Sequence, residues 1–73
     1  MKNKKYIEEL LEIALNDSEP DSTIIDDICD KLDEVSSSNE IAIEITSIIG
    51  IDATKCNNTC AVNKIIEYLE GRL

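Results

Sequence analysis

Three consecutive serines, Ser36, Ser37 and Ser38, lie at the midpoint of this 73-residue chain, just before an apolar periodic segment. The chain contains no histidine, and nothing else in it would activate a serine as a nucleophile. We therefore expect a serine in this position to be a helix cap or an attachment point for a prosthetic group. Capping is the commoner use of a serine at a helix start.

The three cysteines are the other reactive side chains, and they are too few for the disulfide framework of a small secreted domain. We therefore expect reduced thiols, with Cys29 and Cys60 in the core and Cys56 in a loop. The four-residue spacing of Cys56 and Cys60 places two thiols on one face of a helix, which leaves a redox pair as an alternative. Without histidine, the chain lacks a usual ligand set for zinc, and no metal site is expected.

Sixteen acidic residues against seven basic ones give a formal charge of -9, which opposes direct binding to nucleic acids and anionic membranes. Eight of the carboxylates, with a single lysine, fall within residues 17–34. Partners should therefore present basic surfaces. No apolar run approaches the roughly 20 residues of a membrane span, and the first residues lack the apolar stretch of a secretory signal. We expect a cytoplasmic monomer.

The composition predicts one all-α domain over residues 1–73, a small bundle of three to four helices. Apolar residues are almost all Ile, Leu, Val and Ala, with only two aromatic residues, which suits helix packing. These apolar residues recur at three- and four-residue steps in the first, second and last parts of the chain. The expected boundaries are an end near Asn16 for the first helix, a cap on Asp21 or Ser22 for the second, an irregular segment over 51–58, and a cap on Asn58 or Thr59 for the last.

Residues 41–49 fit both a strand and a helix, because their isoleucines alternate and also share a helical face. We favour the helix because Ser37 and Glu40 have the spacing of a capping box. A single strand among helices would also leave its backbone groups unpaired. Gly50 is expected to end this helix, and Ile43 is expected to point away from the core face toward solvent.

Several segments carry a resemblance to a known family. Tyr6-Ile7-Glu8-Glu9-Leu10-Leu11 and Glu40-Ile41-Ala42-Ile43-Glu44-Ile45 are similar to the first helix and the recognition helix of acyl carrier proteins. Residues 61–69 resemble the last helix of that family, so the resemblance runs through nearly the whole chain. Ser37 matches the modified serine best, with Ser36 and Ser38 as its possible replacements. Ser36-Ser37-Ser38 stands where the family usually has Asp-Ser-Leu.

The resemblance implies that Ser37 carries a 4′-phosphopantetheine arm, whose terminal thiol holds an acyl or aminoacyl group as a thioester. The chain itself would catalyse nothing and would present this group to partner enzymes. Glu40 and Glu44, one helical turn apart, would meet Arg or Lys side chains on those enzymes, with Ile43 as an apolar contact beside them.

The alternative is a protein that works only by binding and carries no prosthetic group. Examples are an inhibitor, an antitoxin-like factor, or a phage-encoded anti-defence protein that mimics nucleic acid. Such a protein would place its acidic surface in a basic groove of its partner, and the binding should weaken steeply as salt is added. Modification of a serine is the property that separates the carrier from this alternative.

Overall fold

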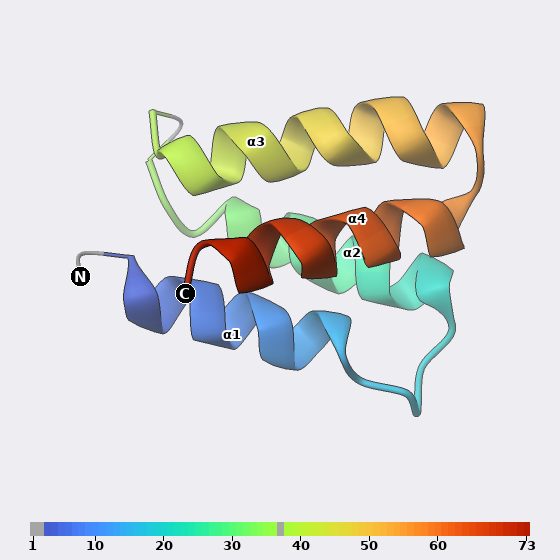
Figure 1. Cartoon of the computed structure of the whole chain (residues 1–73), viewed down its shortest axis with the longest axis horizontal. Helices are drawn as coiled ribbons and strands as arrows, with labels where there is room; N and C mark the ends of the chain where they lie inside the picture. The colour runs from blue at the N-terminus through green and yellow to red at the C-terminus, as the bar shows by residue number, and fades with distance from the viewer. Residues whose placement is uncertain (1–2, 37) are drawn as a thin grey trace.

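The computed structural model describes residues 3–36 and 38–73, and it confirms the prediction of a small all-α bundle. Within these two ranges the fold consists of four α-helices and one π-helical turn: α1 (Lys4–Ala14), α2 (Asp21–Leu32), α3 (Glu40–Ile48), η1 (Ile49–Ala53) and α4 (Asn58–Gly71). No strand occurs within the described ranges. Successive helices run in opposite directions, so the start of α1 and the end of α4 lie at the same end of the bundle as the connection between α2 and α3 (Figure 1).

One hydrophobic core joins the four helices. Its largest fully buried side chains come from every helix, each less than 2 % exposed: Leu10, Ile28, Ile41, Ile45, Ile65 and Leu69. Every buried residue of the described chain is apolar. Burying one such side chain contributes about 1.5 to 3 kcal/mol. The helical periodicity of the sequence therefore identifies the residues that hold the bundle together.

The start of α2 differs from the prediction. Pro20 takes the cap position without a side-chain hydrogen bond, so neither Asp21 nor Ser22 is the cap. Asp21 is instead the first residue of the helix, where its negative charge lies near the positive end of the helix dipole. Its carboxylate also accepts a hydrogen bond from the hydroxyl of Thr59 on α4. This contact joins the beginnings of α2 and α4.

The prediction that Gly50 ends the third helix is wrong. Gly50 has no positive φ, and glycine ends a helix when it takes the left-handed conformation. The chain instead continues through η1 and remains helical to Lys55, so the predicted irregular segment is mostly helix. A π-helical turn holds one more residue per hydrogen-bonded ring than an α-helical turn. α3 and η1 therefore form one long rod along the bundle (Figure 1).

The break before α4 is set by an asparagine. The side chain of Asn57 accepts a hydrogen bond of 2.9 Å from the backbone N–H of Cys60 and so caps the helix. The predicted caps, Asn58 and Thr59, are wrong because both residues already lie within the first turn. Several neighbouring residues have side chains that can cap, and only the backbone path selects among them.

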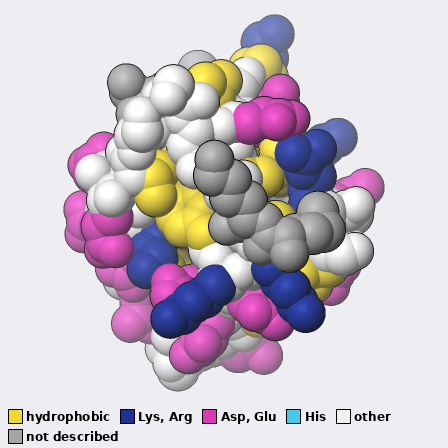
Figure 2. All heavy atoms as spheres, turned by 90° about the vertical axis from the view of Figure 1, so that its left-hand side faces the viewer, with side chains coloured by type: hydrophobic (Ala, Val, Ile, Leu, Met, Phe, Trp, Pro, Cys, Tyr) yellow, Lys and Arg dark blue, Asp and Glu magenta, His cyan; other side chains and the backbone are white. Residues whose placement is uncertain are grey.

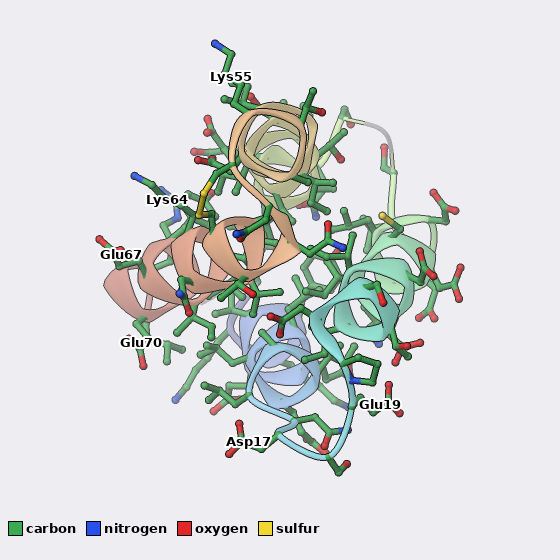
Figure 3. The ribbon with its side chains drawn as sticks, turned by 90° about the vertical axis from the view of Figure 1, so that its right-hand side faces the viewer. Asp17, Glu19, Lys55, Lys64, Glu67 and Glu70 are labelled. Carbon is green, nitrogen blue, oxygen red and sulfur yellow. A yellow bond between two sulfur atoms is a disulfide. The ribbon has the colours of Figure 1, made fainter. Side chains whose placement is uncertain are left out.

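The carboxyl groups of Glu19 and Asp27 are neighbours near the α1–α2 loop. Figure 3 shows this end of the bundle and labels Glu19. One carboxylate oxygen of Glu19 is buried without a hydrogen-bond donor among the described residues. Burial raises the pKa of Glu19, and the neighbouring carboxyl of Asp27 raises that pKa further. Protonation of Glu19 would supply the missing hydrogen between the two groups.

We expect Glu19→Gln to raise the thermal midpoint at about pH 7 and to reduce its gain on acidification to about pH 5. A carboxyl whose folded pKa is raised contributes stability that is complete below its unfolded pKa and is lost as the pH rises through its folded pKa. Thermal unfolding followed by circular dichroism measures both effects. Asp17→Asn, at an exposed position of the same loop, is the matched control. Equal changes in the two variants would attribute the effect to net charge alone.

Candidate functional site

Ser36 and Ser38 lie in the connection between α2 and α3, and we call residues 36–38 the serine loop. The hydroxyl groups of Ser36 and Ser38 are exposed and lie 2.9 Å apart. The hydroxyl oxygen of Ser36 also accepts a hydrogen bond from the backbone N–H of Ser38. Ser37, the predicted attachment site, lies outside the described residues. The loop therefore presents hydroxyl groups to solvent just before the cap of α3.

Asn39 caps α3, so the predicted capping box is wrong. Its side-chain oxygen accepts hydrogen bonds from the backbone N–H groups of Ile41 at 2.9 Å and Ala42 at 3.2 Å. The carboxylate of Glu40 binds Arg72 at 3.0 Å instead of reaching back to the preceding backbone. Two of the N–H groups that a helix start offers to an anion are therefore already occupied.

An apolar groove, the α2–α3 groove, begins at the serine loop and runs between these two helices. Its first part has a volume of about 470 Å³ and is lined by Leu32, Asp33, Val35, Ser36, Ala42, Ile43 and Thr46. A second hollow of about 180 Å³ shares three of these residues and adds Cys29 and Ile49. Figure 2 shows the serine-loop end of the bundle, where apolar side chains reach the surface between charged ones. The groove is therefore open to solvent along a mostly apolar wall.

Three aspartates, Asp26, Asp30 and Asp33, recur at four- and three-residue steps along one face of α2, and we call them the acidic edge. They lie near Cys29, because burial chiefly raises the pKa of its thiol and the charges of all three aspartates raise that pKa further. Cys29 and Asp33 both line the groove, so the carboxylates stand next to its apolar wall. Their spacing of four and three residues is visible in the sequence, but the groove beside them is not.

The acidic edge has no cationic partner within the described part of the chain. The single lysine of α2, Lys31, is held on the other side of the helix. Its ammonium group lies 2.8 Å from a carboxylate oxygen of Glu9 on α1 and 3.3 Å from one of Glu34. Hydrogen bonds to these carboxylates, that of Glu9 first, raise the pKa of Lys31. Lys31 therefore fastens α2 to α1 and leaves the aspartates of the edge uncompensated.

The predicted contact residues of α3 face two different sides. Ile43 is 53 % exposed, which confirms its predicted direction, and it lines the groove with α2. Glu40 and Glu44 lie toward α4, where burial raises the pKa of Tyr68, Arg72 opposes the rise, and the two glutamates add to it. Arg72 lies 5.6 Å from the centre of the Tyr68 ring while it binds Glu40. Both glutamates therefore lie near Tyr68 of α4, whereas Ile43 contributes to the groove with α2.

Cys56 and Cys60 form a disulfide, contrary to the expectation of reduced thiols. Their Cα atoms are 6.1 Å apart, within the range that disulfides span. The bond joins the end of the α3–η1 rod to the start of α4 (Figure 3). The prediction that Cys29 and Cys60 lie in the core is also wrong, since Cys29 is exposed and Cys60 is half-buried. No cluster of His, Cys, Asp and Glu within the described ranges could hold a metal ion.

We expect one free thiol in protein isolated without reductant and three after reduction and denaturation, counted with a chromogenic disulfide reagent. Because the pKa of Cys29 is raised, its reactive thiolate should form only at higher pH than that of an ordinary cysteine. Labelling of Cys29 should therefore be slow at neutral pH. Cys29→Ser should show no free thiol before reduction. Three thiols in the unreduced wild type would contradict the disulfide.

None of the helices described here is long and apolar enough to cross a membrane. Comparison of the chain with protein-family models, with curated proteins and with solved structures finds no match. The contacts and groove described above define the candidate site, which consists of the α2–α3 groove, the acidic edge beside it and the serine loop at its end.

Proposed function

We propose that this chain acts by binding a partner protein, without catalysis, and that the acidic edge receives a basic surface of that partner. The observation that carries the proposal is the acidic edge itself, three uncompensated carboxylates beside an open apolar groove. The net charge of -9 attracts a basic partner over a longer range and disfavours nucleic acid and anionic membranes. An inhibitor, an antitoxin-like factor and a nucleic acid mimic all work in this way. A cytoplasmic monomer is part of the same proposal.

The test compares two variants that lose the same number of charges. The edge variant carries Asp26→Asn, Asp30→Asn and Asp33→Asn. The matched control removes three exposed glutamates elsewhere: Glu12→Gln, Glu67→Gln and Glu70→Gln. Glu67 and Glu70 belong to α4 and project outward from it in Figure 3. Both should keep the helical circular dichroism of the wild type.

Immobilised wild type and both variants are exposed to a lysate of the source cells at rising salt, and the retained proteins are quantified by mass spectrometry. We expect basic proteins that the wild type and the control retain and that the edge variant retains about tenfold less, with release by salt. Retention of the same proteins by the edge variant would overturn the proposal. Retention of nucleic acid in place of protein would overturn it as well.

A second candidate function is that of a divergent acyl or aminoacyl carrier, with 4′-phosphopantetheine on Ser37. The observation that favours it is the position of the groove, which begins at Ser36 and offers an apolar wall to an acyl group carried from the serine loop. The fit is partial, because the N–H groups at the start of α3 are bonded to Asn39 and do not serve the phosphate. Glu40 and Glu44 would then meet basic residues of the partner enzymes.

Intact mass after incubation with coenzyme A and a broad-specificity phosphopantetheinyl transferase tests the carrier function. A carrier should gain about 340 Da, the mass of the arm. The gain should be lost in Ser37→Ala and kept in Ser36→Ala and Ser38→Ala. A known carrier in the same reaction is the positive control. No gain by the wild type beside a modified control would exclude this function and leave binding as the proposal.

A further inference from the structure

We infer that the α2–α3 groove binds a basic amphipathic helix of the partner, with apolar side chains in the groove and Lys or Arg side chains on the acidic edge. The inference rests on the proposed binding function and specifies the shape of the partner. It combines the length of the groove, the exposure of its wall and the charge along its side.

The exposed apolar wall supplies the driving force. Ile43 is 53 % exposed and lines the first part of the groove together with the half-buried Val35, and the half-buried Ile49 lines the second part. Covering apolar surface of this kind contributes about 25 cal/mol for each Å² removed from water. A purely polar partner would gain nothing from this wall. The groove therefore selects a partner segment that has an apolar side.

The length of the groove fits two turns of a helix. Its lining along the α3–η1 rod extends from Ala42 to Ile49, two residues that are seven positions apart and are therefore separated by about 10 Å along the helix axis. This is the distance between side chains at positions i and i+7 of a partner helix, with i+3 or i+4 between them. A partner strand would need an open sheet edge to pair with, and the described residues form helices only.

The acidic edge has the same length as the groove and overlaps it on the α2 side, where the lining extends from Cys29 to Ser36. Asp26 and Asp33 are also seven residues apart, and both the last aspartate of the edge and Cys29 line the groove. A helix that places its apolar stripe in the groove turns its flanking positions toward these carboxylates. Lys or Arg at those positions would supply the cations that the edge lacks. Charge complementarity therefore identifies the partner helix as basic.

A second copy of this chain does not meet that requirement. Each copy carries a net charge of -9, so a dimer would place further negative charge against the acidic edge. The lysine of α2 is already held by Glu9 and Glu34 and cannot serve a second copy. The occupant is therefore a different protein.

Two synthetic peptides of about 15 residues test the inference, since a helix of this length covers the groove with a turn to spare at each end. Both peptides contain only Leu and Lys, and each residue type occurs the same number of times in the two peptides. One has Leu at helical spacing on one face, and the other is a scrambled sequence of the same composition. Binding is measured by fluorescence anisotropy, and the helix content of each peptide by difference circular dichroism. We expect the amphipathic peptide to bind at least about tenfold more tightly and to gain helix on binding.

Two variants of α3 locate the binding site. Ile43→Asp places a charge in the groove and should reduce binding of the amphipathic peptide to the level of the scrambled one. Ser47→Asp places the same charge on an exposed position of the same helix that does not line the groove, and it should leave binding unchanged. Thermal unfolding of both variants checks that each is folded. Equal binding by Ile43→Asp and Ser47→Asp would overturn the inference.

Other outcomes distinguish this inference from the proposed function. The two peptides could bind equally and in a salt-sensitive way, and the edge variant could lose this binding. That result would overturn the inference that a helix occupies the groove, and it would support the proposed function of the acidic edge. Undiminished binding of both peptides by the edge variant would overturn the proposed function itself.

Discussion

Ile45→Ala should lower the free energy of unfolding by about 2 to 5 kcal/mol, whereas Ile43→Ala on the same helix should change it by less than about 1 kcal/mol. Ile45 has no exposed surface, so its truncation leaves a cavity in the core. Ile43 is 53 % exposed and leaves no such cavity. Both changes remove the same atoms and alter helix propensity equally, so their difference reports burial alone.

This pair of variants also tests whether residues 41–49 form a helix or a strand. In a strand, Ile43 and Ile45 would share one face, because side chains alternate with a period of two. The two truncations would then have similar effects. In the helix they lie on different faces, and only one faces the core. Equal losses of stability would therefore contradict the fold of α3.

Chemical denaturation followed by circular dichroism measures both variants against the wild type. A domain of this size has a free energy of unfolding near the lower end of the usual range, about 5 kcal/mol. Ile45→Ala should therefore retain only about 0 to 3 kcal/mol. Its denaturation midpoint should be much lower than that of the wild type, and an unchanged midpoint would contradict the core position of Ile45.

The interiors of the helices were predictable because each depends on many residues at once. Leu10, Ile28 and Ile65 lie at helical spacing from other apolar residues in their segments, and all three are fully buried. Helix boundaries depend on one or two hydrogen bonds each. Asn39 and Asn57 cap their helices although neighbouring residues have equally suitable side chains. Periodicity therefore predicts the core, and only the path of the backbone determines the caps.

The candidate site was less predictable because it lies between elements. The spacing of Asp26, Asp30 and Asp33 can be read from the sequence, and so can the outward direction of Ile43. The groove depends on how closely α2 packs against α3, which no local pattern encodes. The ion pair of Glu40 joins residues 32 positions apart, and its partner Arg72 gave no signal in the sequence. Local spacing predicted the parts of the site but not their arrangement.

Asn39→Ala should lower the free energy of unfolding by about 1 kcal/mol, the usual cost of losing an N-cap. The side-chain oxygen of Asn39 satisfies two backbone N–H groups of α3 that would otherwise turn to solvent. Ser38→Ala is the matched control, because Ser38 is exposed and bonds only within the serine loop. Its change should stay within about 0.5 kcal/mol of the wild type.

Chemical denaturation of both variants, together with Ser37→Ala, decides where α3 begins. A larger loss in Ser37→Ala than in Asn39→Ala would place the cap in the serine loop, as the capping box predicted. The N–H groups of Ile41 and Ala42 would then be free of Asn39 and open to an anion on that loop. The carrier function would gain the phosphate site that it lacks when Asn39 is the cap. A loss confined to Asn39→Ala keeps those N–H groups occupied and favours the function in which the groove and the acidic edge bind a partner protein.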